Sequence, residues 1–185
     1  RQCGKTYSVL EFAKKNYAHT VYLNFFENPQ FVSVFSGSLE VDNITMLLSA
    51  LMGQDAVFES GKTLLVLDEI QDCPDARTAL KFFKLDGRYD VIGTGSLLGV
   101  KGYGSKEPKS IPVGYETVLD MSPLDFEEFL WAMGDEATYP LIRHCFEAKQ
   151  PLGAALHRKI MNDFRQYILV GGMPQSVLAY MNGKD

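Results

Sequence analysis

The sequence has few residues of the kinds that build metal clusters or disulfide frameworks. Its 185 residues include only three cysteines, three histidines and one tryptophan. The cysteines and histidines lie far apart, without the spacing of metal ligands: Cys3, Cys73, Cys145, His19, His144 and His157. Because this pattern is typical of reduced thiols, we expect a cytoplasmic protein without a cysteine–histidine metal centre.

Long apolar runs and an excess of positive charge are also missing. No apolar stretch reaches the length of a membrane-spanning helix, so we expect no contact with a membrane. The net charge of −5 argues against binding nucleic acid through bulk positive charge. Hydrophobic residues make up 46% and charged residues 22% of the chain, which is ordinary for a globular protein.

The chain opens with Arg1-Gln2-Cys3-Gly4-Lys5-Thr6, the second half of the phosphate-binding pattern G-x-x-x-x-G-K-[ST]. Gly4 permits a tight turn, and the backbone amides of the loop, Cys3 and Gly4 among them, can point at a phosphate. Lys5 supplies positive charge for the outer phosphates, and the Thr6 hydroxyl can ligate Mg²⁺. The strand that normally feeds such a loop precedes Arg1, so we expect the natural protein to extend upstream.

The run Thr63-Leu64-Leu65-Val66-Leu67-Asp68-Glu69 is apolar without alternation and ends in two carboxylates. It predicts a strand buried on both faces of a parallel sheet. Ligands of such sheets bind at the carboxyl ends of the strands, where the phosphate loop also lies. We therefore expect Asp68 to face the Mg²⁺ held by Thr6, through water, and Glu69 to orient and deprotonate an attacking water.

Hydroxyl groups end the next predicted strand, at 89–96. Thr94 or Ser96 could touch the γ-phosphate or the attacking water, and the alternative is a turn rich in small residues. Ser96 is our choice for a catalytic, sensor-like residue because it lies nearer the end of the strand. Arg77 and Arg88 lie between the two strands, and either could reach a neighbouring subunit's nucleotide as an arginine finger.

Strands alternate with helices up to about residue 136, and only helices follow. The alternation predicts an α/β fold, a mostly parallel sheet sandwiched by helices. We place the core at 1–136 and the start of a helical second domain at 137–185. The predicted strands are 20–26, 63–69, 89–96 and 117–121. The predicted helices include 6–15, 43–52, 74–84 and 154–169. Asp42 is the predicted cap of the helix at 43–52, and a further helix is expected to open with Ser122 as cap and Pro123 at its first position.

The motifs together resemble a known family. The chain is similar to AAA-type P-loop ATPases of bacteria and archaea that are usually described only as ATP-binding proteins and carry a second domain of unknown function. The resemblance rests on the order of five pieces: Arg1-Gln2-Cys3-Gly4-Lys5-Thr6, Leu67-Asp68-Glu69-Ile70-Gln71, Thr94-Gly95-Ser96, Pro123-Leu124-Asp125-Phe126-Glu127-Glu128-Phe129-Leu130 and Gly171-Gly172-Met173-Pro174.

The resemblance implies a P-loop NTPase core of AAA type that binds ATP and Mg²⁺ and hydrolyses ATP. It assigns Lys5 and Thr6 to the phosphates and Mg²⁺, Asp68 and Glu69 to the second motif, and Ser96 to the sensor-like hydroxyl. Two alternatives stay open. One is a nucleotide-gated switch with little or no hydrolysis; the other is a DNA-associated assembly in which ATP only promotes association. A homo-oligomer, and a protein or DNA partner of the second domain, are further expectations.

Overall fold

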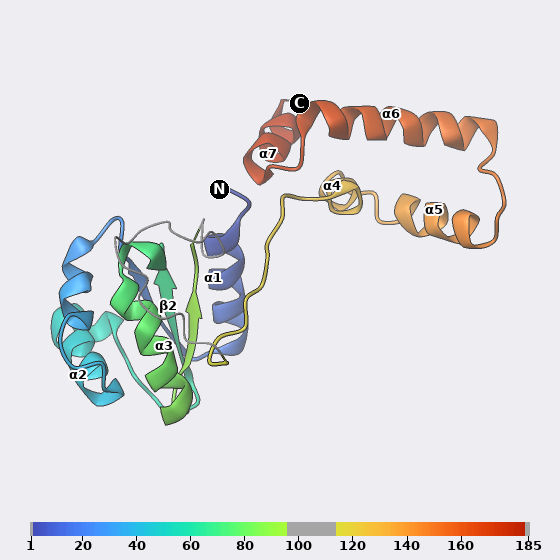
Figure 1. Ribbon diagram of the computed structural model, residues 1–185. Helices are drawn as coiled ribbons and strands as arrows, with labels where there is room; N and C mark the ends of the chain where they lie inside the picture. The colour runs from blue at the N-terminus through green and yellow to red at the C-terminus, as the bar shows by residue number, and fades with distance from the viewer. Residues whose placement is uncertain (1, 96–113, 184–185) are drawn as a thin grey trace. The chain divides into compact units, whose positions relative to one another are not determined.

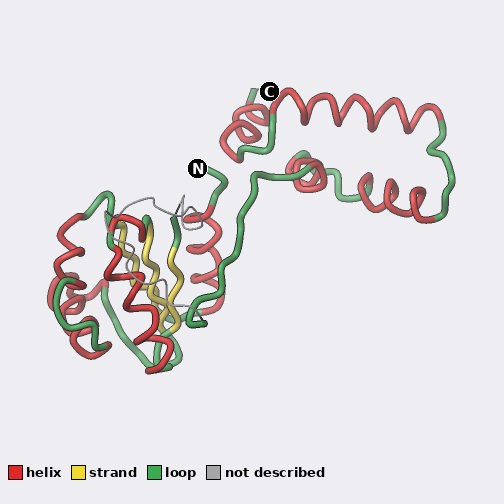
Figure 2. Tube along the Cα trace, in the orientation of Figure 1, coloured by secondary structure: helices red, strands yellow, loops and turns green. Residues whose placement is uncertain are grey.

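The computed structural model describes residues 2–95 and 114–183, and these residues form two compact units. One unit runs from Lys5 to Leu119, and the other joins Arg1–Gly4 to Asp120–Asp185 (Figures 1 and 2). The first unit carries the sheet, and the second is helical. The predicted division of the chain at residue 136 stays a prediction.

The Lys5–Leu119 unit is built from alternating helices and strands, as the sequence pattern predicts. Its elements are α1 (Lys5–Asn16), β1 (His19–Asn24), the 3₁₀ turn η1 (Pro29–Phe35), α2 (Val41–Met52), η2 (Gly53–Asp55), β2 (Thr63–Asp68), η3 (Ile70–Asp72), α3 (Pro74–Asp86) and β3 (Asp90–Gly93).

The three strands form one parallel sheet in the order β1-β2-β3. Every residue of β2 is buried, because β2 has a strand on each side and helices on both faces. The prediction of a parallel sheet sandwiched by helices is therefore confirmed.

Alternate side chains of β2 enter two different cores. Leu64 and Val66 pack with Ala13 of α1 on one face. Leu65 and Leu67 lie on the other face, in the larger core to which α2 and α3 contribute. Figure 1 shows α1 on one side of the sheet and α3 on the other. Each buried leucine or valine stabilises the fold by about 1.5–3 kcal/mol. Because such side chains point to both faces, β2 is stabilised by packing on both sides of the sheet.

A predicted strand at 117–121 does not form. These residues have no strand partner among residues 2–95 and 114–183, and Val118 and Leu119 are 59% and 87% exposed. An isolated extended segment leaves its backbone groups to water, so apolar and β-branched residues alone do not make a strand.

Two predicted helix caps are wrong. Residue Glu40, not Asp42, is the N-cap of α2, and Asp42 in the first turn instead pairs with Arg88 at 2.6 Å. Helix α4 (Phe126–Ala132) begins after Asp125, not after Ser122. Asp125 and Glu128 form a reciprocal capping box, which satisfies two backbone amides at once and so sets the start of the helix.

The second unit packs helices around an aromatic cluster. Its helices are α4, α5 (Thr138–Glu147), α6 (Ala154–Val170) and α7 (Pro174–Asn182). The rings in contact belong to Phe126, Phe129, Phe164, Tyr167 and Tyr180. The phenylalanine rings of α4 therefore pack against α6 and α7.

A close backbone approach joins the Pro-Leu segment before α4 to the Gly-Gly segment after α6. The Leu124 amide donates to the Gly172 carbonyl at 2.8 Å, and the Tyr167 hydroxyl donates to the Leu124 carbonyl at 3.0 Å. A Cβ on Gly172 would lie 2.0 Å from the Leu124 carbonyl oxygen. Only glycine fits here, which gives a physical reason for these two motifs to occur together.

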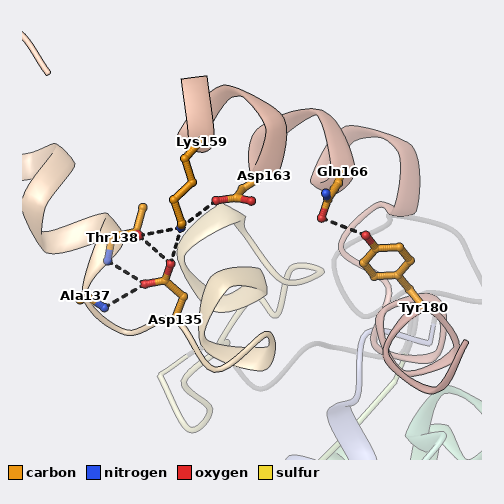
Figure 3. A network of polar contacts seen from close by, with 7 residues as sticks. All are labelled: Asp135, Ala137, Thr138, Lys159, Asp163, Gln166 and Tyr180. Atoms are coloured by element: carbon orange, nitrogen blue, oxygen red, sulfur yellow. Dashed lines mark hydrogen bonds and ion pairs between the residues drawn. The ribbon is translucent and has the colours of Figure 1, made fainter. Parts of the chain in front are cut away.

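A polar network ties the start of α5 to α6 (Figure 3). The Asp135 carboxylate accepts the Thr138 amide at 2.9 Å and the Thr138 hydroxyl at 2.6 Å. Lys159 of α6 donates to Asp135 at 2.8 Å and to Asp163 at 3.0 Å. The hydrogen bonds from Lys159 and Thr138 hold the pKa of Asp135 well below its usual range.

Replacing Gly172 with alanine should destabilise the helical unit. The added Cβ would collide with backbone rather than with a flexible side chain, and overpacking of this kind costs about 1–3 kcal/mol. Urea unfolding followed by circular dichroism at 222 nm would measure the loss. Gly153→Ala is the matched control, because a Cβ there meets nothing within 4 Å. Equal unfolding midpoints for the two variants would contradict the close approach.

Replacing Asp135 with alanine should cost about 1–2 kcal/mol of unfolding free energy at pH 7, as for the loss of a helix cap. Because folding lowers this pKa, the stabilisation is complete above the unfolded pKa of about 3.9 and is lost as pH falls through the folded pKa. The difference from wild type should therefore shrink in urea unfolding at strongly acid pH. Asp163→Ala, which removes a single ion pair with Lys159, should cost only about 0.5 kcal/mol.

Candidate functional site

The phosphate-loop motif contains two residues with left-handed φ angles just before helix α1. Gln2 and Gly4 both have positive φ angles, 60° and 88°, and helix α1 begins at Lys5. Alternation of this kind turns successive amides toward one concave side, where an anion can bind. Cys3 is buried, and its Sγ lies 3.4 Å from the Met121 carbonyl oxygen within the helical unit.

Strand periodicity gathers polar side chains at the carboxyl end of the sheet. Leu64, Val66 and Asp68 alternate along β2, so Asp68 falls on the face that α1 covers. Tyr22 of β1 and Ile92 of β3 pack on that same face. Two backbone hydrogen bonds of 2.9 Å, from the Thr94 amide to Leu67 and from the Ile70 amide to Thr94, fix Thr94 beside the end of β2.

Asp68 is the centre of this site. Its Oδ2 accepts the Thr6 hydroxyl at 2.9 Å and the Tyr22 hydroxyl at 2.7 Å. Its Oδ1 accepts the Glu69 amide at 3.1 Å and the Thr94 hydroxyl. The Thr6 side chain and the Asp68 carboxylate are therefore in direct contact, whereas the sequence predicts only that both lie near the same Mg²⁺.

The hydrogen bonds decide the charge of Asp68. With the residue only 4% exposed, burial by itself would raise the pKa of this carboxyl. The donors Thr94, Tyr22 and Thr6, with the Glu69 amide, outweigh that effect and hold the pKa below its usual value. Burial, together with the hydrogen bond to Asp68, raises the pKa of Tyr22 to about 12, so this hydroxyl stays protonated and donates.

Glu69 occupies a left-handed backbone conformation, with φ 52° and ψ 46°. For a residue other than glycine this conformation costs about 1–2 kcal/mol, and such strain collects at functional sites. The Glu69 carboxylate accepts a hydrogen bond from the Gln71 side chain. The buried Gln71 Oε1 has no hydrogen-bond partner among the residues that the structure describes. The left-handed turn sends Glu69 away from the path of the strand, so the two adjacent carboxylates have different surroundings.

The chemistry of these groups fits Mg²⁺ and a phosphate. Mg²⁺ prefers oxygen ligands and is usually held by one or two carboxylates together with substrate phosphates and water. Thr6 and Asp68 supply a hydroxyl and an ionised carboxylate within 2.9 Å of each other. Among residues 2–95 and 114–183 no cluster of three histidine, cysteine or acidic side chains forms a separate metal site.

The arginines considered as arginine fingers are both engaged within the Lys5–Leu119 unit. Arg77 pairs with Glu116 at 2.6 Å through a bidentate contact. Arg88 pairs with Asp42 at 2.6 Å and with Asp86 at 2.7 Å. Neither arginine contacts Asp68 or Glu69 in any hydrogen bond of the described residues.

A family model for the AAA domain matches residues 1–130, which include the phosphate loop, both carboxylates and Thr94. The chain belongs to the AAA domain family. It is thus an AAA-type P-loop NTPase-like protein with an α/β core, as the motif order predicts. No curated protein and no solved structure matches it. No helix in the described part of this AAA domain protein is long and apolar enough to cross a membrane.

The site brings together three of the predicted residues and adds others. Thr6, Asp68 and Glu69 lie at the end of β2, while Ser96 falls outside the described residues. Thr94, weighed against Ser96 from the sequence, contacts Asp68 directly. Tyr22, Asn24 and Gln71 were not predicted. Tyr22 and Asn24 could have been recognised as polar residues two positions apart at the end of an apolar strand. The predicted strand ran to residue 26, whereas β1 ends at Asn24, so this pattern was not placed at the strand end.

Proposed function

We propose that this AAA domain protein binds ATP with Mg²⁺ and hydrolyses it to ADP and phosphate, by attack of water on the γ-phosphate. The reaction would be coupled to a conformational or regulatory task. The observation that carries the proposal is the 2.9 Å hydrogen bond from Thr6 to Asp68, which joins the phosphate loop to the carboxyl end of the central strand. The choice of ATP follows the family to which the chain belongs.

Each residue of the site has a role in this proposal. The amides of Cys3 and Gly4 and the Lys5 ammonium hold the phosphates, and Thr6 and Asp68 hold the metal ion. Bound Mg²⁺ would neutralise charge on the phosphate oxygens. Glu69 orients a water molecule and takes its proton as the water attacks, while a hydroxyl at Thr94 or Ser96 senses the γ-phosphate.

The proposal also concerns the family group, localisation, assembly and partners of the protein. We infer that it belongs to the group of AAA-type ATPases with a C-terminal domain of unknown function, that it is cytoplasmic, and that it assembles as a homo-oligomer. A protein or DNA partner would bind through the C-terminal domain. Sedimentation with and without ATP and DNA tests the assembly. A monomer in every condition would overturn the homo-oligomer, and the absence of any ATP-dependent change would count against assembly that ATP promotes.

A second candidate is a nucleotide-gated switch with little or no hydrolysis. The contact between Glu69 and Gln71 favours it, because one oxygen of the general base is already occupied by an amide donor. A switch of this kind binds nucleotide and changes conformation without turnover. The two candidates share the binding site and differ only in the use of Glu69.

Replacing Lys5 with alanine should abolish nucleotide binding. Removing one charge next to the phosphates costs several kcal/mol at short range, so the affinity for ATP should fall by about 100-fold or more. Titration of a fluorescent ATP analogue in Mg²⁺ measures it. Lys15→Ala removes the same charge from the last turn of the same helix and should leave binding unchanged. Micromolar affinity retained by Lys5→Ala would refute the site.

Replacing Glu69 with glutamine should lower ATP turnover by about 10²- to 10⁴-fold, because the proton acceptor is lost. Nucleotide affinity should stay the same, since glutamine keeps the size of the side chain. Phosphate release measures turnover, and Glu27→Gln is the matched control, an exposed glutamate just beyond β1. Negligible turnover in the wild type, left unchanged by Glu69→Gln, would reject hydrolysis and leave the switch.

A further inference from the structure

The central carboxylate has a donor on the neighbouring strand that the phosphate-loop and carboxylate motifs do not include. The Tyr22 hydroxyl of β1 lies 2.7 Å from Asp68 Oδ2. The side-chain amide of Asn24 donates to the same hydroxyl at 3.3 Å. The Asn24 Oδ1 in turn accepts the amides of Phe26 at 3.0 Å and Glu27 at 2.9 Å. A chain of hydrogen bonds thus runs from the turn after β1 to Asp68.

The strand register explains why Tyr22 reaches Asp68. In the parallel pairing of β1 and β2, Tyr22 lies beside Val66 and Asn24 lies beside Asp68. Tyr22 packs on the face of the sheet where Leu64 and Val66 meet α1. A long tyrosine side chain on that face extends toward the carboxyl end and brings its hydroxyl to the carboxylate two positions beyond Val66.

Packing alone does not account for a tyrosine at this position. The ring contributes to the small core beneath α1, and a phenylalanine ring would fill the same space. The hydroxyl finds its partners only at Asp68 and Asn24, within the residues that the structure describes. Tyr22 therefore brings a donor to a metal-binding oxygen at a depth where solvent does not supply one.

The four donors hold the two carboxylate oxygens in different ways. Thr94 and the Glu69 amide hold Oδ1, while Thr6 and Tyr22 share Oδ2. Thr6 belongs to the phosphate loop and is itself a metal ligand in the proposed function. Among the described residues, Tyr22 is the donor to Oδ2 that lies outside the loop, so it fixes the carboxylate independently of the loop.

We infer that Tyr22, oriented by Asn24, is a positioning residue that holds the Asp68 carboxylate in the orientation in which it binds Mg²⁺ together with Thr6. The inference rests on the proposed function, because it concerns the same metal. Groups that hold a metal ligand in place affect metal affinity by about 10- to 100-fold when they are removed. The Tyr22 hydroxyl then affects the affinity for the metal. It does not affect the contacts between the phosphate loop and the nucleotide.

The test is Tyr22→Phe, with nucleotide binding measured as a function of Mg²⁺. A fluorescent ATP analogue is titrated in EDTA and at increasing Mg²⁺, and Mn²⁺ binding in the presence of ATP is followed by electron paramagnetic resonance. The Mg²⁺ concentration for half-maximal binding should rise by about 10-fold. Affinity for the nucleotide in EDTA should be unchanged, which a general loss of structure would not produce.

Tyr17→Phe is the matched control. The Tyr17 hydroxyl donates to Asp90 at 2.7 Å, so each variant loses a tyrosine hydrogen bond to an aspartate of the same sheet. Asp90 begins β3 while Asp68 ends β2, which puts the two bonds at opposite ends of parallel strands. Tyr17→Phe should keep the wild-type response to Mg²⁺.

The outcomes separate this inference from the proposed function. A Tyr22→Phe protein with the wild-type Mg²⁺ response, or an equal change in both variants, overturns the positioning role alone. Weaker binding of Tyr22→Phe in EDTA as well as in Mg²⁺ also overturns it, because the effect would then not lie at the metal. A wild-type protein whose nucleotide binding ignores Mg²⁺ overturns the metal site of the proposed function, and the inference falls with it.

Discussion

Burying an ionised carboxylate at the end of a central strand requires hydrogen-bond donors from every direction that solvent would otherwise occupy. Asp68 is in that position, and its donors come from α1, from β1, from the turn after β2 and from the segment after β3. An unpaired buried charge costs several kcal/mol, so these four segments must meet with hydrogen-bond geometry. The sheet order, the start of α1 and the register of β1 all serve this one requirement.

Adjacent carboxylates acquire different hydrogen-bond partners through backbone geometry. Asp68 continues the strand and faces the donors beneath α1, where it stays ionised. Glu69 leaves the strand through a left-handed residue and meets the Gln71 side chain instead. Two neighbours in sequence have different surroundings because the chain turns between them.

The helical unit shows the same dependence on backbone contact. Its Pro-Leu and Gly-Gly segments meet through the Leu124 amide and the Gly172 carbonyl, at a distance that excludes any side chain at Gly172. Asp135 joins the start of α5 to Lys159 of α6. Each contact links different elements of the helical unit, and the first requires glycine at position 172.

Local patterns in the sequence determined the α/β alternation, the buried strand at β2, the phosphate loop and the pair Asp68 and Glu69, because periodicity and motif spacing act over short range. The tertiary structure decided the features that depend on contacts between distant segments. It placed Tyr22 against Asp68 through strand register and chose Asp125 over Ser122 as a cap. It also left 117–121 without a strand partner among the described residues. Hydrogen bonds between distant segments are set by how strands pair and helices cover them, and no local pattern records that geometry.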